Sequence, residues 1–108
     1  MAKNIYLAST GPKSGKSIIC LGLINAFRGM VTNVGYFKPI GQKYRANEIH
    51  DKESIMIKEI FGIEDELKHI NPASIKKLNH YITSNDQETF FHKVQESYEK
   101  VEKDKDIV

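Results

Sequence analysis

The residues with the clearest chemical potential are nine consecutive ones, Ser9 to Ser17, with the sequence STGPKSGKS. A glycine-rich loop that leads into a helix turns its backbone N–H groups toward one point, and the positive end of the helix adds to the attraction for an anion. In such a loop a lysine reaches the β- and γ-phosphates of a nucleotide, and the hydroxyl after it coordinates Mg²⁺. The spacing predicts that Lys16 and Ser17 take these two roles.

The loop departs from the phosphate-loop pattern G-x-x-x-x-G-K-[ST] only at its start. Gly15, Lys16 and Ser17 match the last three positions. Thr10 replaces the first glycine, and Gly11 follows one place later. The alternative interpretation is a surface turn that contains Gly-Lys-Ser by chance.

Two strands and a helix are predicted around this loop. The stretch from Asn4 to Ser9 is mostly apolar, which is typical of a strand buried in a parallel sheet. Residues from Ser17 to about Met30 are apolar around much of the helical circumference, which predicts a buried helix. The run from Val34 to Phe37 predicts a second strand, which ends at Pro39 because proline lacks a backbone donor.

Lys38 is predicted to lie at the same edge of the sheet as the loop. A strand–helix–strand unit has parallel strands, and ligands bind outside the carboxyl ends of such strands. Lys38 stands at the carboxyl end of the second strand. The alternative is a strand-end lysine that is solvated or held by a helix C-terminus. The polar segment from 40 to 52 is predicted to be irregular and to lie over the nucleotide or a second substrate.

Several helical segments are predicted in the rest of the chain. Apolar periodicity predicts a helix over 53–61 that ends at Gly62, and one more turn within 65–70. Asn71-Pro72 predicts the start of a helix that runs to about Tyr81. The capping-box spacing of Asn85 to Glu88 predicts the start of a final helix. The last is amphipathic, with an apolar face of Phe90, Phe91, Val94, Tyr98 and Val101. The final residues, Ile107 and Val108, predict the start of a third strand.

Composition excludes several classes of function. With 40% hydrophobic and 28% charged residues the chain has an ordinary globular composition, and its net charge of +2 is spread along the sequence, so nothing indicates a nucleic-acid partner. No apolar run approaches the roughly 18 residues of a membrane span, and no signal peptide precedes the first strand. A single cysteine, Cys20, favours a reducing compartment. We therefore expect a cytoplasmic protein without membrane association.

These elements predict an α/β fold, a P-loop NTPase-like three-layer α/β/α arrangement with a parallel sheet. All 108 residues are expected to belong to one domain. Two strands with this many helical segments cannot form a balanced core, because a parallel sheet must be covered on both faces. The chain is therefore expected to be the N-terminal part of one nucleotide-binding domain that continues beyond Val108, and to be catalytically silent alone.

With the loop, the segment from Tyr36 to Gln42 and the terminal Asp106-Ile107-Val108, the chain resembles the dethiobiotin-synthetase-like P-loop group. Within that group it is most similar to the N-terminal domains of long-form phosphate acetyltransferases. Those domains open with a strand, a Thr-Gly-x-x-x-Gly-x-[Ser/Thr] loop, a long helix and a Phe-Lys-Pro-Ile-x-Gln segment, in the same order as here. The resemblance covers residues 4 to 42 well and is weaker from Ile49 to Ile82.

The resemblance implies ATP and Mg²⁺ as cofactors. By position, the residues that bind the triphosphate are Thr10, Gly11, Pro12, Lys13, Ser14, Gly15, Lys16 and Ser17. Ser17 and Asp51 are implied as Mg²⁺ ligands, and Lys16 and Lys38 as the catalytic lysines, with Lys38 near a substrate carbamate and the transferred phosphate. Asp51 is matched by spacing alone, and it is equally suited to be the N-cap of the helix that follows. The phosphate acetyltransferase domains often lack the loop lysine, which this chain has.

Three functions remain open at this stage. The first is a nucleotide-binding module that regulates or assembles an attached acyl-phosphate enzyme. The second is an ATP-dependent synthetase of the dethiobiotin or cobyrinate amidation type, which phosphorylates a carboxylate or carbamate. The third is a P-loop fold that binds a partner and no nucleotide. The expected partners are a nucleotide, a small carboxylate or acyl-phosphate substrate, and further copies of the same chain.

Overall fold

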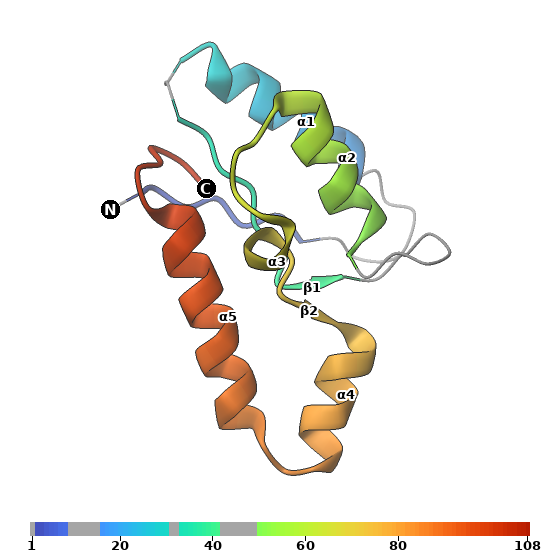
Figure 1. Cartoon of the computed structure of the whole chain (residues 1–108). Coiled ribbons are helices and arrows are strands. Elements are labelled where there is room, and N and C mark those ends of the chain that lie inside the picture. The colour runs from blue at the N-terminus through green and yellow to red at the C-terminus, as the bar shows by residue number, and fades with distance from the viewer. Residues whose placement is uncertain (1, 9–15, 31–32, 42–49) are drawn as a thin grey trace. The chain divides into compact units, whose positions relative to one another are not determined.

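The computed structural model describes residues 2–8, 16–30, 33–41 and 50–108. Among them the order of elements, drawn in Figure 1, is α1 (Lys16–Arg28), β1 (Ile40–Gly41), α2 (Lys52–Phe61), α3 (Leu67–Ile70), β2 (Ala73–Ser74), α4 (Ile75–Thr83) and α5 (Gln87–Glu102). The chain divides into two units. The first unit comprises residues 1–35 and 102–108, and the second unit comprises residues 36–101. Each is described by itself.

The first unit contains parallel pairing between three segments that are distant in the sequence. Ile107 forms parallel bridges with both Lys3 and Val34. The backbone N–H of Gly35 donates to the carbonyl of Ile107 over 2.8 Å, and that of Lys3 donates to the carbonyl of Asp106 over 2.9 Å. The terminal segment therefore lies between the two N-terminal ones. Within the described residues, bridges occur at Lys3, just before the predicted first strand, and at Val34 in the predicted second strand, so the regular pairing is shorter than the sequence indicated.

Helix α1 of the first unit buries less than the sequence predicted. Ile24 is 6% exposed, whereas Ile18 and Ile19 are 76% and 54% exposed. At about 100° per residue, these two side chains lie on a different side of the helix from Ile24. The prediction of a helix buried around its circumference is wrong, because the described segments of this unit cover one side of α1.

The second unit contains the other parallel pair. Strands β1 and β2 are in register with Ile40 opposite Ala73 and Gly41 opposite Ser74. The sequence predicted an irregular segment where β1 lies and a helix where β2 lies. Strands of two residues give no alternation of apolar and polar side chains, so periodicity could not detect them. The α/β class with a parallel sheet, predicted from the sequence, is confirmed.

Helix α2 begins and ends close to where the sequence indicated. Gly62 adopts a left-handed conformation (φ 60°, ψ 39°), and its N–H donates to the carbonyl of Lys58, which closes the helix. The Lys58 ammonium then binds the carbonyls of Ile63 and Asp65, at 2.6 and 2.7 Å. These bonds fix the chain after the helix.

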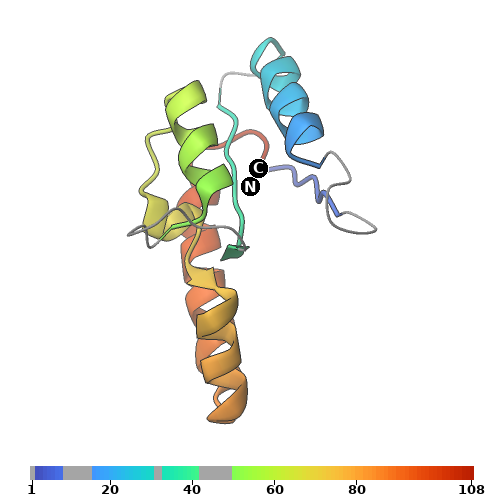
Figure 2. The ribbon, with the colours of Figure 1, turned by 90° about the vertical axis from the view of Figure 1, so that its right-hand side faces the viewer.

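Helices α4 and α5 form a hairpin, which Figures 1 and 2 show from two sides. Ser74 is the N-cap of α4 and accepts a hydrogen bond from the N–H of Lys77 over 3.1 Å. The prediction that Asn71-Pro72 opens this helix is therefore wrong, since those residues precede β2. Helix α5 begins near the predicted capping box, where Asp86 accepts a hydrogen bond from Thr89.

Apolar side chains from several elements form the core of the second unit. The rings of Phe37 and Tyr98 make a T-shaped contact with their centroids 5.3 Å apart, which joins the segment before β1 to α5. The ring centroids of Tyr81 of α4 and Phe90 of α5 lie 5.6 Å apart. The buried apolar side chains of this unit are Tyr36, Ile55, Ile57, Ile70, Ala73, Phe90 and Val101. No helix within the described residues is long and apolar enough to cross a membrane.

Candidate functional site

Lys38, Asp51, Glu53 and Asn71 meet in the second unit, and we call these four residues the Lys38 cluster. The backbone N–H of Lys38 donates to the carbonyl of Ile70 at the end of α3 over 2.8 Å. The carbonyl of Lys38 accepts a hydrogen bond from Nδ2 of Asn71 over 2.9 Å. Because its backbone N–H and carbonyl are both hydrogen-bonded, the backbone of Lys38 is held in place at the base of the side chain.

Two carboxylates bind the ammonium of Lys38. Its Nζ lies 3.1 Å from Oδ2 of Asp51 and 2.7 Å from Oε2 of Glu53. The lysine side chain is 17% exposed, and those of Asp51 and Glu53 are 0% and 12% exposed. Charge-assisted hydrogen bonds that are shielded from water in this way are stronger than those of surface pairs. The structure thus joins two residues that the sequence analysis selected, Lys38 and Asp51.

Asp51 also builds the start of α2. Its backbone is extended (φ −61°, ψ 136°), and its Oδ2 accepts a hydrogen bond from the N–H of Ser54 over 3.2 Å. This is the N-cap geometry that the sequence analysis offered as the alternative to metal binding. One carboxylate therefore serves both the helix end and the ammonium of Lys38.

Asn71 connects the strand segments to the start of α2. Its Oδ1 accepts a hydrogen bond from the N–H of Asp51 over 2.9 Å. Its Nδ2 donates to the carbonyls of Lys38 and Ala73, at 2.9 and 3.1 Å. With 3% of its surface exposed, Asn71 acts as a buried brace that sets the positions of Lys38 and Asp51.

The electrostatics of the cluster favour a charged lysine. Burial on its own lowers the pKa of Lys38, but the hydrogen bonds and charges of Glu53 and Asp51 outweigh burial and raise the pKa above its ordinary value of 10.5. Lys38 is therefore an ammonium at neutral pH. With one positive and two negative groups, the cluster carries a net charge of −1 when no ligand is bound.

Two residues close to Asp51 in the sequence carry buried polar atoms. Nδ1 of His50 and Oγ of Ser54 are buried and have no hydrogen-bond partner among the residues that the structure describes. Buried polar groups are normally bonded. The start of α2 therefore has hydrogen-bonding capacity that the described part of the chain does not use.

The oxygen donors of the cluster are of the kind that Mg²⁺ takes. In this structure, however, the ammonium of Lys38 stands between the carboxylates of Asp51 and Glu53. No group of three or more His, Cys, Asp or Glu side chains suited to a metal occurs within residues 2–8, 16–30, 33–41 and 50–108. In this arrangement the ammonium of Lys38 occupies Oδ2 of Asp51 and Oε2 of Glu53.

The remaining predicted site residues belong to the first unit. Thr10, Gly11, Pro12, Lys13, Ser14 and Gly15 lie outside the described residues. Helix α1 begins at Lys16, directly after them, and Ser17 is exposed in its first turn. The helix that was predicted to follow the glycine-rich segment is therefore present.

Glu53 and Asn71 are not among the site residues predicted from the sequence. Glu53 follows Asp51 by two residues in the first turn of α2, where an acidic side chain has an ordinary role beside the positive helix end. Asn71 precedes a proline, a pattern that also predicts a helix cap. Neither pattern contains a signal for the contact with Lys38, which depends on the tertiary fold.

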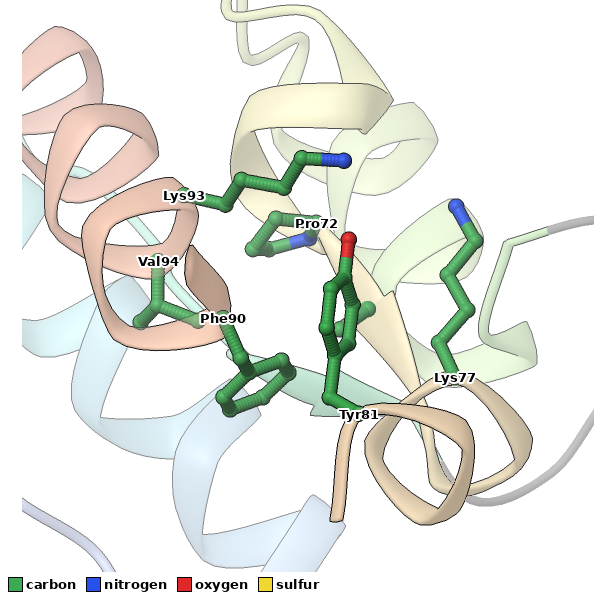
Figure 3. Close-up of a pocket in the computed structure, with 7 residues that line it drawn as sticks. Pro72, Lys77, Tyr81, Phe90, Lys93 and Val94 are labelled. Atoms are coloured by element: carbon green, nitrogen blue, oxygen red, sulfur yellow. The ribbon is translucent and has the colours of Figure 1, made fainter. Parts of the chain in front are cut away.

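A small pocket, separate from the Lys38 cluster, lies between β2, α4 and α5. Its lining residues are Pro72, Ala73, Lys77, Tyr81, Phe90, Lys93 and Val94 (Figure 3). Nζ of Lys93 lies 5.7 Å from the centre of the Tyr81 ring, and a hydrogen bond with Tyr81 raises the pKa of Lys93. These contacts join two residues of the pocket lining, one from α4 and one from α5.

The family of the chain is shown by comparison with known proteins. The family model described as AAA domain, a P-loop class, matches residues 3–108. The chain belongs to this family.

The relatives found for this chain are phosphate acetyltransferases and dethiobiotin synthetases. The chain is 26% identical over 108 residues to a phosphate acetyltransferase of Nitratidesulfovibrio vulgaris, which covers 100% of this chain and 15% of the relative. A phosphate acetyltransferase of Synechocystis is 34% identical over 64 residues, 59% of this chain and 9% of the relative. An ATP-dependent dethiobiotin synthetase of Caldicellulosiruptor saccharolyticus is 29% identical over 77 residues, 69% of this chain and 32% of the relative. The chain thus spans a minor part of each relative's length, and the resemblance drawn from the sequence is confirmed.

Proposed function

We propose that this chain is the nucleotide-binding part of a phosphate acetyltransferase-type protein, in which bound ATP with Mg²⁺ regulates or assembles an attached acyl-phosphate enzyme. The observation that carries this proposal is the similarity to a phosphate acetyltransferase over 100% of the chain. The family match over residues 3–108 adds the P-loop class.

In this proposal the loop binds the triphosphate through Thr10 to Gly15, Lys16 binds phosphate oxygens, and Ser17 and Asp51 are ligands of Mg²⁺. The start of α1 at Lys16 supports these roles, because the positive end of a helix then follows the loop directly. The low exposure and the ion pairs of Lys38 support a role in placing an anionic group. A Mg²⁺ ion on Asp51 would share this carboxylate with Lys38 or displace the ammonium from Oδ2.

Equilibrium binding of labelled ATP in the presence of Mg²⁺ tests the proposal in the full-length protein. We expect saturable binding that Lys16→Ala weakens at least tenfold, because a charge-assisted contact to phosphate is lost. Lys76→Ala, which removes an exposed lysine of α4, is the matched control and leaves binding unchanged. Absence of ATP binding by the unsubstituted protein would favour a P-loop fold that binds only a partner.

A second candidate is an ATP-dependent synthetase that transfers the γ-phosphate of ATP to a carboxylate or carbamate oxygen and releases ADP. The similarity to a dethiobiotin synthetase favours it. Lys16, Lys38 and Mg²⁺ would stabilise the charge that develops on the transferred phosphate. Substrate-dependent release of ADP, abolished in Lys16→Ala, would support this candidate. No turnover with any carboxylate or diamine substrate would exclude it.

Three features of the whole protein belong to the same proposal. We place the protein in the cytoplasm, as a homo-oligomer, with a small carboxylate or acyl phosphate as substrate of the full-length protein. Analytical ultracentrifugation of the full-length protein tests the oligomer, and a sedimentation coefficient of a monomer at all concentrations would contradict it.

A further inference from the structure

We propose that Glu53 is an internal competitor for Lys38. In the ligand-free protein the Glu53 carboxylate binds the ammonium of Lys38, and an oxyanion of the ligand, either a carboxylate or a phosphate, competes with it for this contact. This inference rests on the proposed function, in which Lys38 contacts the anionic part of a ligand. It adds a residue that limits how tightly an anionic ligand binds.

The two carboxylates on Lys38 are not equivalent. Asp51 is 0% exposed, and its Oδ2 is shared between Nζ of Lys38 and the N–H of Ser54 at the start of α2. Withdrawing Asp51 would uncap the helix and leave buried polar groups unbonded, which is costly. Asp51 is therefore a fixed part of the cluster.

The side chain of Glu53 makes fewer interactions than that of Asp51. The one hydrogen bond of its side chain within the described residues is the 2.7 Å contact with Nζ of Lys38, and this side chain is 12% exposed, whereas that of Asp51 is 0% exposed. A glutamate in the first turn of a helix has three rotatable side-chain bonds, so its carboxylate can turn to water without moving the backbone. Of the two carboxylates, Glu53 is the one that an incoming anion can replace.

The charge of the cluster explains what such a replacement requires. With Asp51 and Glu53 both present the net charge is −1, which repels an anion. An anion that reaches the third N–H of the Lys38 ammonium beside both carboxylates meets this net negative charge, so its binding is stronger once Glu53 turns outward. Glu53 therefore weakens the binding of anions at Lys38.

Substitution of Glu53 by glutamine tests this in the full-length protein, with inorganic phosphate and acetate as separate probes in isothermal titration calorimetry. We expect Glu53→Gln to tighten binding of one probe by about tenfold, because the competing ionic contact is weakened. Tighter phosphate binding identifies a phosphoryl subsite, and tighter acetate binding identifies a carboxylate subsite. The gain disappears in the double variant Glu53→Gln with Lys38→Met.

The matched control is Glu59→Gln, which removes the same charge from an exposed position on the same helix. An equal gain in this control, or no gain in Glu53→Gln for either probe, would overturn the inference. If Glu53→Gln does not fold, the side-chain carbon signals of Lys38 and Glu53 are followed in the unsubstituted protein while phosphate is added. Competition requires that both signals shift together, and a shift of Lys38 alone would contradict it. ATP binding that depends on Lys16 reports on the proposed function separately, so failure of one is distinct from failure of the other.

Discussion

The side-chain oxygen of Asn71 accepts a hydrogen bond from the backbone N–H of Asp51 over 2.9 Å, so a residue just before β2 fixes the residue that caps α2. Asn71 also holds the carbonyl of Lys38, and one amide therefore positions both partners of the buried ion pair. Asn71 thus adds long-range hydrogen bonds to the local ones that hold Asp51 at the start of α2.

Replacing Asn71 by alanine should destabilise the fold markedly. It removes three hydrogen bonds and leaves buried backbone groups of Lys38 and Asp51 without a partner. We expect a loss of about 2–4 kcal/mol in the free energy of unfolding, measured by urea denaturation. Asn79→Ala, at an exposed position of α4, should change it by less than about 0.5 kcal/mol. Equal effects of the two substitutions would contradict the bracing role.

The two functions of Asp51 can be separated by a pair of substitutions. Asp51→Asn keeps an oxygen that accepts the N–H of Ser54 but removes the charge that faces Lys38. Asp51→Ala removes both. We expect losses in unfolding free energy of about 1–2 kcal/mol for the first and about 2–4 kcal/mol for the second, in the same urea assay. Equal losses would mean that the cap adds nothing.

The stability of the fold should depend on Lys38 at alkaline pH. The pKa of Lys38 is raised in the folded chain above its ordinary value of 10.5, after burial, which lowers it, is outweighed by the contacts with Glu53 and Asp51. Its contribution is therefore fully present below about pH 10.5 and is lost as the pH rises through the folded value. Urea unfolding of the native sequence and of Lys38→Met across this range isolates the effect, since other groups titrate alike in both. A constant difference between the two proteins above pH 10.5 would contradict the raised pKa.

Two glycines should respond oppositely to alanine. Gly62 adopts φ 60° at the end of α2, where a side chain is strained, so Gly62→Ala should cost about 1 kcal/mol of unfolding free energy. Gly22 lies inside α1, and outside its own helix no atom of the described residues lies within 4 Å of an added methyl group. Gly22→Ala should therefore raise the free energy of unfolding by about 0.5–1 kcal/mol. Thermal or urea unfolding measures both. A gain from Gly62→Ala would show that the left-handed cap is not required.

Local signals predicted part of the fold well. Helix α2 could be delimited because Asp51 and Gly62 act through their own backbone neighbourhoods, and α5 because its apolar side chains recur at the helical period. The parallel pair β1 and β2 was missed because two-residue strands contain no period. The N-cap of α4 was placed at Asn71 in place of Ser74, since an Asn-Pro sequence resembles a cap and the intervening strand has no local mark.

The candidate site divides in the same way. Lys38 and Asp51 could be selected, since each stands at the end of a recognisable element and the resemblance gave each a position. Glu53 and Asn71 could not, because their roles are contacts with residues 15 and 33 positions earlier in the chain. Such contacts are set by tertiary packing, and no spacing rule encodes them.

The pairing of Ile107 with both Lys3 and Val34 has a consequence for the order in which the protein forms on the ribosome. Residues 36–101, which make up the second unit, leave the ribosome before the strand segment that pairs with both N-terminal ones. Closing contacts between residues 3 and 107 costs more chain entropy than closing local ones, and such contacts are slow to form. Synthesis therefore favours early folding of the second unit, with its Lys38 cluster, and late completion of the first.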